Sequence, residues 1–121
     1  MAEILNTSTF EVSGPAGTPP YHVLVYTNLY KATLASSINT DEAVLPAVVL
    51  VSSCNSSGRG IAIRDGVILN EFGFNKGQPV YVGVDGSLTQ IPPDAGYIRI
   101  IGVALEPNAL QVIIHPGIVV A

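Results

Sequence analysis

Short apolar runs alternate with turn-forming residues along most of the chain. From Tyr21 onward β-branched and aromatic residues dominate these runs, and no segment has the 3.6-residue period of an amphipathic helix. Runs of this kind, separated by turn residues, are typical of antiparallel sandwiches and barrels. The sequence therefore predicts an all-β fold, a small antiparallel β-sandwich or barrel built from hairpins. We expect strands over residues 22–27, 30–34, 43–52, 61–64, 67–70, 79–84, 87–90, 97–105 and 109–115.

Two Asp-Gly pairs give the clearest turn signals. Asp65-Gly66 and Asp85-Gly86 each follow a run of alternating apolar residues. Because Asp tolerates positive φ and Gly adopts it freely, both pairs fit the two-residue type I′ turn of a hairpin. A further hairpin is expected at residues 106–108.

The run over residues 97–105 is nearly all apolar, which predicts a central strand buried on both faces. Gly102 within this run has no side chain to pack, so it predicts a bulge or the close approach of another backbone.

The N-terminal third differs from the rest. Residues 1–12 contain the apolar positions Leu5, Phe10 and Val12, and residues 13–20 are rich in Gly and Pro. We expect residues 1–20 to form an extended N-terminal arm with a Pro/Gly linker, and residues 21–121 to form the β domain. Such an arm could add a strand to a neighbouring sheet. The alternative is that residues 1–12 form a first strand of the same domain.

Charge is scarce. Charged residues are 12% of the chain and apolar types are 48%, with a formal net charge of −4. A small domain has a large surface relative to its volume, so this composition predicts that part of the surface is covered by self-association or by a partner.

The five cations are scattered along the sequence, without the basic stripe that nucleic-acid binding requires. The apolar runs are also too short to span a bilayer. We therefore expect no nucleic-acid or membrane partner. The N-terminus has no signal pattern, so we expect synthesis in a cytoplasm.

No catalytic, metal or cofactor-binding residues emerge from the sequence. Cys54 excludes an internal disulfide because it is the only cysteine, and its polar neighbours predict a loop. His22 and His115 each lie in or beside an apolar strand, where a structural role is the usual one. Carboxylates from different strands could still meet in space, so an enzyme remains an alternative.

Three C-terminal segments resemble a known pattern. Gly77-Gln78-Pro79-Val80-Tyr81-Val82, then Ile100-Ile101-Gly102-Val103-Ala104-Leu105, then Leu110-Gln111-Val112-Ile113 are similar to the C-terminal strands of small capsid cement (decoration) proteins of tailed bacteriophages. Comparable strands also occur in β-rich tips of phage tail fibres.

The resemblance implies a structural virion protein without catalytic residues. Members of this family sit on the capsid surface, usually as homotrimers, and bridge neighbouring subunits of the major capsid protein. On this reading the expected interface residues are Leu5, Phe10, Val12 and Tyr81, the last because its ring is apolar and its tip polar. A tail-fibre or baseplate module involved in attachment is the alternative.

Overall fold

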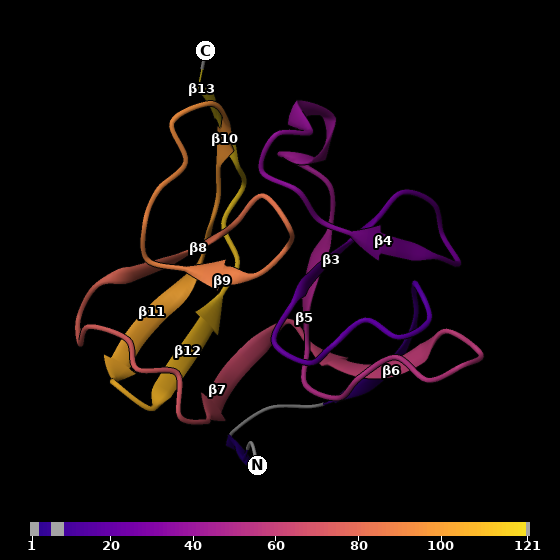
Figure 1. Ribbon diagram of the computed structural model, residues 1–121, viewed down its shortest axis with the longest axis horizontal. Coiled ribbons are helices and arrows are strands. Elements are labelled where there is room, and N and C mark those ends of the chain that lie inside the picture. Colours follow the sequence, from indigo (N-terminus) through magenta and orange to yellow (C-terminus); the bar gives the residue numbers. More distant parts are fainter. Residues whose placement is uncertain (1–2, 6–8, 121) are drawn as a thin grey trace.

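The computed structural model describes residues 3–5 and 9–120, and its strands form three antiparallel sheets. The first has the order β1-β7-β12-β11-β8-β9, the second β2-β6-β5-β3-β4, and a short ribbon pairs β10 with β13 (Figure 1). A 3-10 helix, η1, covers Thr40–Glu42. The strands are β1 Glu3–Leu5, β2 Phe10–Ser13, β3 Val23–Tyr26, β4 Ala32–Leu34, β5 Ala47–Leu50, β6 Arg59–Ile63, β7 Asp65–Leu69, β8 Pro79–Val82, β9 Leu88–Thr89, β10 Gly96–Ile98, β11 Ile100–Glu106, β12 Ala109–Ile113 and β13 Ile118–Val120.

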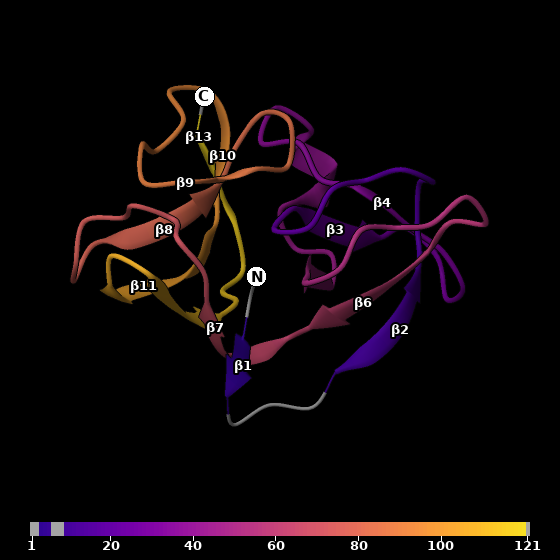
Figure 2. The ribbon, with the colours of Figure 1, turned by 60° about the horizontal axis from the view of Figure 1, so that its bottom comes forward.

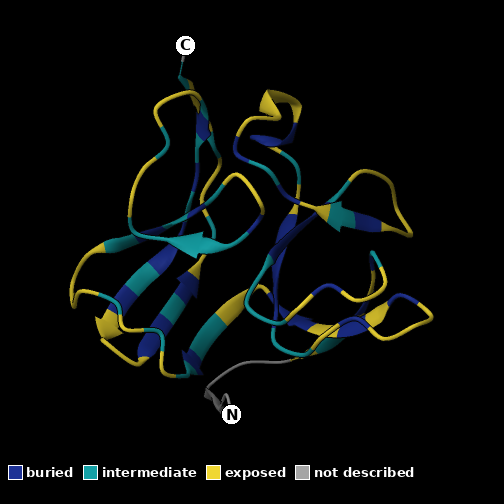
Figure 3. Cartoon of the chain, in the orientation of Figure 1, coloured by how far each residue is buried: buried dark blue, intermediate teal, exposed yellow. Residues whose placement is uncertain are grey.

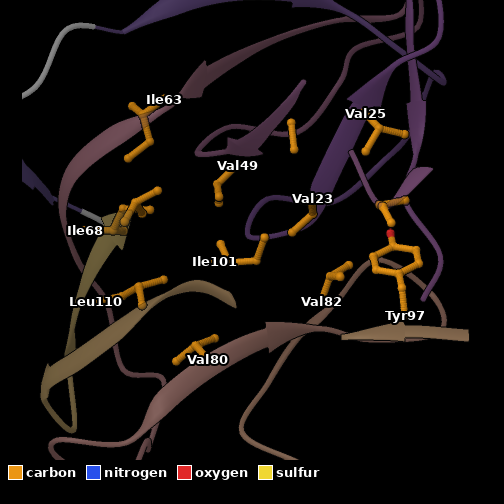
Figure 4. Close-up of a cluster of buried hydrophobic side chains, with 14 residues drawn as sticks. Val23, Val25, Val49, Ile63, Ile68, Val80, Val82, Tyr97, Ile101 and Leu110 are labelled. Atoms are coloured by element: carbon orange, nitrogen blue, oxygen red, sulfur yellow. The ribbon is translucent and has the colours of Figure 1, made fainter. Parts of the chain in front are cut away.

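The six-stranded and five-stranded sheets pack face to face around one core. Alternate residues of each strand point inward, since successive side chains of a strand lie on opposite faces. Val23 and Val49 of the five-stranded sheet meet Ile101 and Leu110 of the six-stranded sheet in one buried cluster (Figure 4). The all-β prediction of a sandwich or barrel is confirmed.

A second apolar cluster lies on the other face of the five-stranded sheet. It contains Leu24 and Val48, the neighbours in sequence of Val23 and Val49. This sheet is therefore buried on both faces, and exposed residues concentrate in the loops (Figure 3). The cluster consists of Val12, Leu24, Ala32, Val48, Leu50, Cys54 and Ala62, with Phe10 and Tyr26 packed against it.

The predicted central strand divides into two. β11 lies between β12 and β8, as expected for a buried strand, but β10 belongs to a separate ribbon with β13. The break is at Arg99, and β13 was not predicted. At Gly102 a Cβ atom would lie 2.1 Å from the carbonyl oxygen of Gln111, and the register with β8 shifts there. The expected close approach of another backbone is confirmed.

The two Asp-Gly pairs behave differently from each other. β8 and β9 form the predicted hairpin. Its loop has three residues instead of the expected two, because Gly83 N donates to Ser87 O. Of the Asp85-Gly86 pair, only Gly86 has positive φ, so the turn is not of type I′. A type I turn followed by a left-handed residue gives this geometry.

The hairpin predicted at Asp65-Gly66 is wrong. β6 pairs with β2 and β5, whereas β7 pairs with β12 and β1. The chain thus passes from one sheet to the other at this point, and Gly66 sits opposite Val112 inside β7 with a φ of 115°. The positive φ expected at Gly66 is present, but it redirects the chain from one sheet to the other instead of closing a hairpin.

The prediction of a free N-terminal arm is also wrong for the described residues. β1 pairs with β7, and β2 pairs with β6 over four residues (Figure 2). Residues 13–20 do not act as an extended linker either, because Gly14 N donates to Gly58 O and Gly17 N donates to Cys54 O. The alternative interpretation, strands of the same domain, describes this segment, since backbone groups inside a fold need partners.

The buried position of Val12 gives a direct test of this arrangement. Val12 is 2% exposed, so Val12→Ala should lower the free energy of unfolding by about 2 kcal/mol through lost burial and a cavity. Ser13→Ala, at an exposed position of the same strand, is the control and should change stability by less than about 0.5 kcal/mol. Chemical denaturation measures both, and equal stability of the two variants would contradict the assignment of β2 to the core.

Candidate interaction surfaces

The predicted interface residues do not form one surface. Val12 is buried in the second cluster, so its prediction as an interface residue is wrong. Phe10 is half-buried, with the Arg64 guanidinium carbon 4.7 Å from its ring centroid. Tyr81 is half-buried in β8, where it pairs with Ile100 and Thr89. The side chain of Leu5 lies outside what the structure describes.

A different segment presents apolar groups to solvent. The loop of residues 27–31, here called the projecting loop, joins β3 to β4 and carries Leu29 and Tyr30, which are 86% and 84% exposed. Its shape is fixed by Asn28, whose side-chain oxygen accepts hydrogen bonds from the backbone N–H groups of Tyr30 and Lys31, both at 2.9 Å. Such an Asx turn lets two large side chains point outward without a regular strand.

Two grooves flank the projecting loop, and each contains a cation. One, of about 300 Å³, is lined by Leu29, Tyr30 and Arg59 among others. The other, of about 450 Å³, is lined by Leu29 and Arg64 with Pro46. Sheet pairing therefore brings Arg59 and Arg64 beside a loop that itself contains Lys31, so three of the five cations of the chain lie in or beside this loop.

A concave surface lies among other loops. It is a depression of about 370 Å³, here called the hollow, with apolar walls and hydroxyl groups. Val84, Ile91 and the two prolines supply the apolar part, and Val84 and Ile91 are 59% and 78% exposed. Its lining residues are Ser37, Gly83, Val84, Ser87, Thr89, Ile91, Pro92, Pro93 and Asp94.

Two carboxylates border the hollow. Asp94 is one of its lining residues, and Asp85 lies in the turn between Val84 and Ser87. The side-chain oxygen of Asp85 accepts hydrogen bonds from the hydroxyl and the backbone N–H of Ser87, which lower the pKa of Asp85. Asp85 is therefore ionised at neutral pH, and this rim is negatively charged.

A buried polar network holds the wall of the hollow in place. Glu42 is 7% exposed, and its carboxylate accepts a hydrogen bond from Ser36 N at 2.9 Å and one from the Tyr97 hydroxyl at 3.4 Å. Ser37 O accepts from Tyr97 N, and Ser37 N donates to Gly83 O. These bonds tie residues 36–42 to β10 and to the β8–β9 hairpin, so the hollow is preorganised.

Arg99 lies at the centre of this network, at the break between β10 and β11. It is 5% exposed, and its guanidinium donates to His115 O at 2.7 Å and to Glu42 O at 3.2 Å. Burial lowers the pKa of Arg99, while Tyr97 and Glu42 raise it. A buried cation needs such acceptors because it has left water. The network was not predicted, since its members are far apart in sequence.

Cys54 lies in the loop that its polar neighbours predicted, but its side chain is buried in the second cluster. Burial raises the pKa of the Cys54 thiol, partly offset by a hydrogen bond with Thr18. Its chemistry is therefore that of a small apolar side chain.

Residues 3–5 and 9–120 contain no group of three or more His, Cys, Asp or Glu side chains able to hold a metal ion. Within the same ranges, no helix is long and apolar enough to cross a membrane. Comparison with protein-family models and with curated proteins gave no match to this chain.

Removing the buried guanidinium should be far more damaging than removing an exposed one. Arg99→Ala takes the guanidinium donor from the carbonyl groups of His115 and Glu42 and removes the positive charge near the buried Glu42 carboxylate, so we expect a loss of about 3 to 5 kcal/mol in unfolding free energy. Arg59→Ala breaks an exposed ion pair with Glu11 at 2.8 Å and should cost at most about 1 kcal/mol. Thermal and urea unfolding of both variants provide the comparison, and similar losses would refute the structural role of Arg99.

Tyr97 makes the stability of the fold sensitive to alkaline pH. Burial first, and then the Glu42 carboxylate, raise the pKa of Tyr97 from 10.0 to about 12. Between these values an unfolded chain loses the phenolic proton while the folded chain keeps it, so stability falls as pH rises. The fall should exceed that of Tyr97→Phe by about 2 to 3 kcal/mol between pH 10 and about 12. Denaturation curves at a series of pH values test this, and parallel pH profiles for the two proteins would contradict it.

Proposed function

We propose that the protein is a structural virion component that binds the outside of an assembled phage capsid as a homo-oligomer, expected to be a trimer, and bridges neighbouring subunits of the major capsid protein. Its action is stabilisation by binding. A protein that binds only the assembled shell stabilises it by about 2.7 kcal/mol per site when its free concentration is 100 times Kd.

The observation that carries this proposal is the exposure of large apolar side chains on two loop surfaces of a chain with 12% charged residues. Leu29 and Tyr30 are exposed on the projecting loop, and Val84 and Ile91 are exposed at the hollow. Exposed apolar side chains that lie together, as on these two surfaces, are typical of contacts with other proteins. Both surfaces are held by defined hydrogen bonds, which lowers the entropic cost of binding.

The three segments that resemble cement proteins lie together in the fold. They correspond to β8, β11 and β12, which are adjacent strands of one sheet. The three segments therefore form a continuous part of that sheet, in which Gly102 lies close to the backbone of Gln111.

A tail-fibre or baseplate module is the second candidate. Tyr30 is 84% exposed beside a groove, and an exposed aromatic ring is the usual stacking platform for a sugar. On this reading the projecting loop binds a host glycan.

A comparison of virions with and without this protein distinguishes the capsid role from the attachment role. Particles of the phage that encodes this chain, prepared with and without its gene, should differ in the head. We expect electron microscopy to locate the protein at regularly repeated positions on the capsid, and its loss to lower the temperature at which the heads release DNA. Purified protein added back should restore that temperature. Protein found only on the tail, with unchanged head stability, would favour the attachment module and refute the capsid role.

A further inference from the structure

The two apolar surfaces differ in shape. The projecting loop is convex and ends in Leu29 and Tyr30, whereas the hollow is concave with a volume of about 370 Å³. Tyr30 combines an apolar ring with a hydroxyl, and the hollow combines proline and isoleucine walls with the hydroxyls of Ser87 and Thr89. A tyrosine inserted there would bury its ring and keep its hydroxyl near hydrogen-bonding groups.

The two surfaces also differ in charge. Lys31 lies in the projecting loop, and Arg59 and Arg64 line the grooves beside it. Asp94 lines the hollow, and Asp85 lies in the turn between its lining residues Val84 and Ser87. One cation there, Arg59, is already paired with Glu11. The remaining excess of positive charge on one surface and of negative charge on the other makes them electrostatically complementary.

We propose that the projecting loop of one copy of this chain docks into the hollow of a second copy, with Tyr30 as the anchor. This inference rests on the self-association in the proposed function but requires no capsid. Tyrosine is frequent among residues that dominate binding energy, and rim charges of opposite sign set the register of such contacts.

The contact joins two different surfaces, so it is heterologous. A pair of copies joined by one such contact leaves one loop and one hollow unoccupied, and further copies can add until a ring closes. The lining residues of the hollow and the residues of the projecting loop do not overlap, so one copy can use both surfaces at once.

A mixing experiment tests the heterologous contact. Tyr30→Asp disables the loop and Ile91→Asp disables the hollow. Both positions are more than three-quarters exposed, at 84% and 78%, so both variants should stay folded, and as monomers they should melt at similar temperatures. By sedimentation analysis each variant alone should be monomeric, whereas the parent is oligomeric. An equimolar mixture should form a dimer and nothing larger, since it contains one intact loop and one intact hollow per pair.

Charge exchange tests the pairing of the rims. Lys31→Glu and Asp94→Lys should each weaken self-association by roughly tenfold, and the double variant should recover most of that loss. Lys76→Glu is the control, because Lys76 pairs with Glu106 and lines neither the hollow nor the grooves beside the loop. It should leave self-association unchanged.

Two results would overturn the inference. One is a parent protein that stays monomeric at about 100 µM, a concentration that would populate a contact of micromolar Kd. The other is an oligomeric parent whose two disabled variants fail to pair when mixed, which would show that the contact between loop and hollow does not join the copies. Neither result depends on capsid binding, which the virion comparison measures separately.

Discussion

The buried guanidinium of Arg99 is the constraint on which the upper part of the molecule in Figure 1 depends. A cation removed from water must be surrounded by acceptors, and here the carbonyl groups of Glu42 and His115 provide them. Both residues contact Arg99 although they are 57 and 16 positions away from it in the sequence. The requirement therefore pins η1 and the segment before β13 to the start of β11. Gly117 N, which donates to Ala43 O, adds a second tie between the same two segments.

Strand positions were largely predictable, because alternation of apolar and polar residues reports burial directly. Sheet membership was not. β6 and β7 follow each other as a hairpin would, yet they belong to different sheets, since Gly66 turns the chain between layers instead of back on itself. The run over residues 97–105 looked like one strand because nearly all of it is apolar. The break at Arg99 depends on acceptors from Glu42 and His115, which the local pattern does not reveal.

The candidate surfaces were less predictable than the fold. Tyr30 was expected to begin a strand, but it lies in a turn whose backbone N–H groups donate to the Asn28 side chain, and it is exposed together with Leu29. Arg59 and Arg64 come to the same loop because β6 carries or adjoins both of them. The signal available in the sequence was the Asn at position 28 before two large apolar residues. For Val12 the prediction failed in the opposite direction. Its position beside a Pro/Gly segment suggested an exposed interface residue, but the side chain is buried in the second cluster.

The position of Cys54 gives the protein a built-in probe of its own local motion. The thiol lies between two backbone segments: Cβ atoms added at Gly60 and Gly14 would be 3.2 and 3.7 Å from its sulfur. A thiol reagent can reach it only when the cover over the second cluster opens. Because the sequence contains no other cysteine, the rate of modification reports the free energy of that opening alone. The five-stranded sheet separates the second cluster from the main core. Opening of the segments that cover the second cluster can therefore be measured while the two sheets stay packed together.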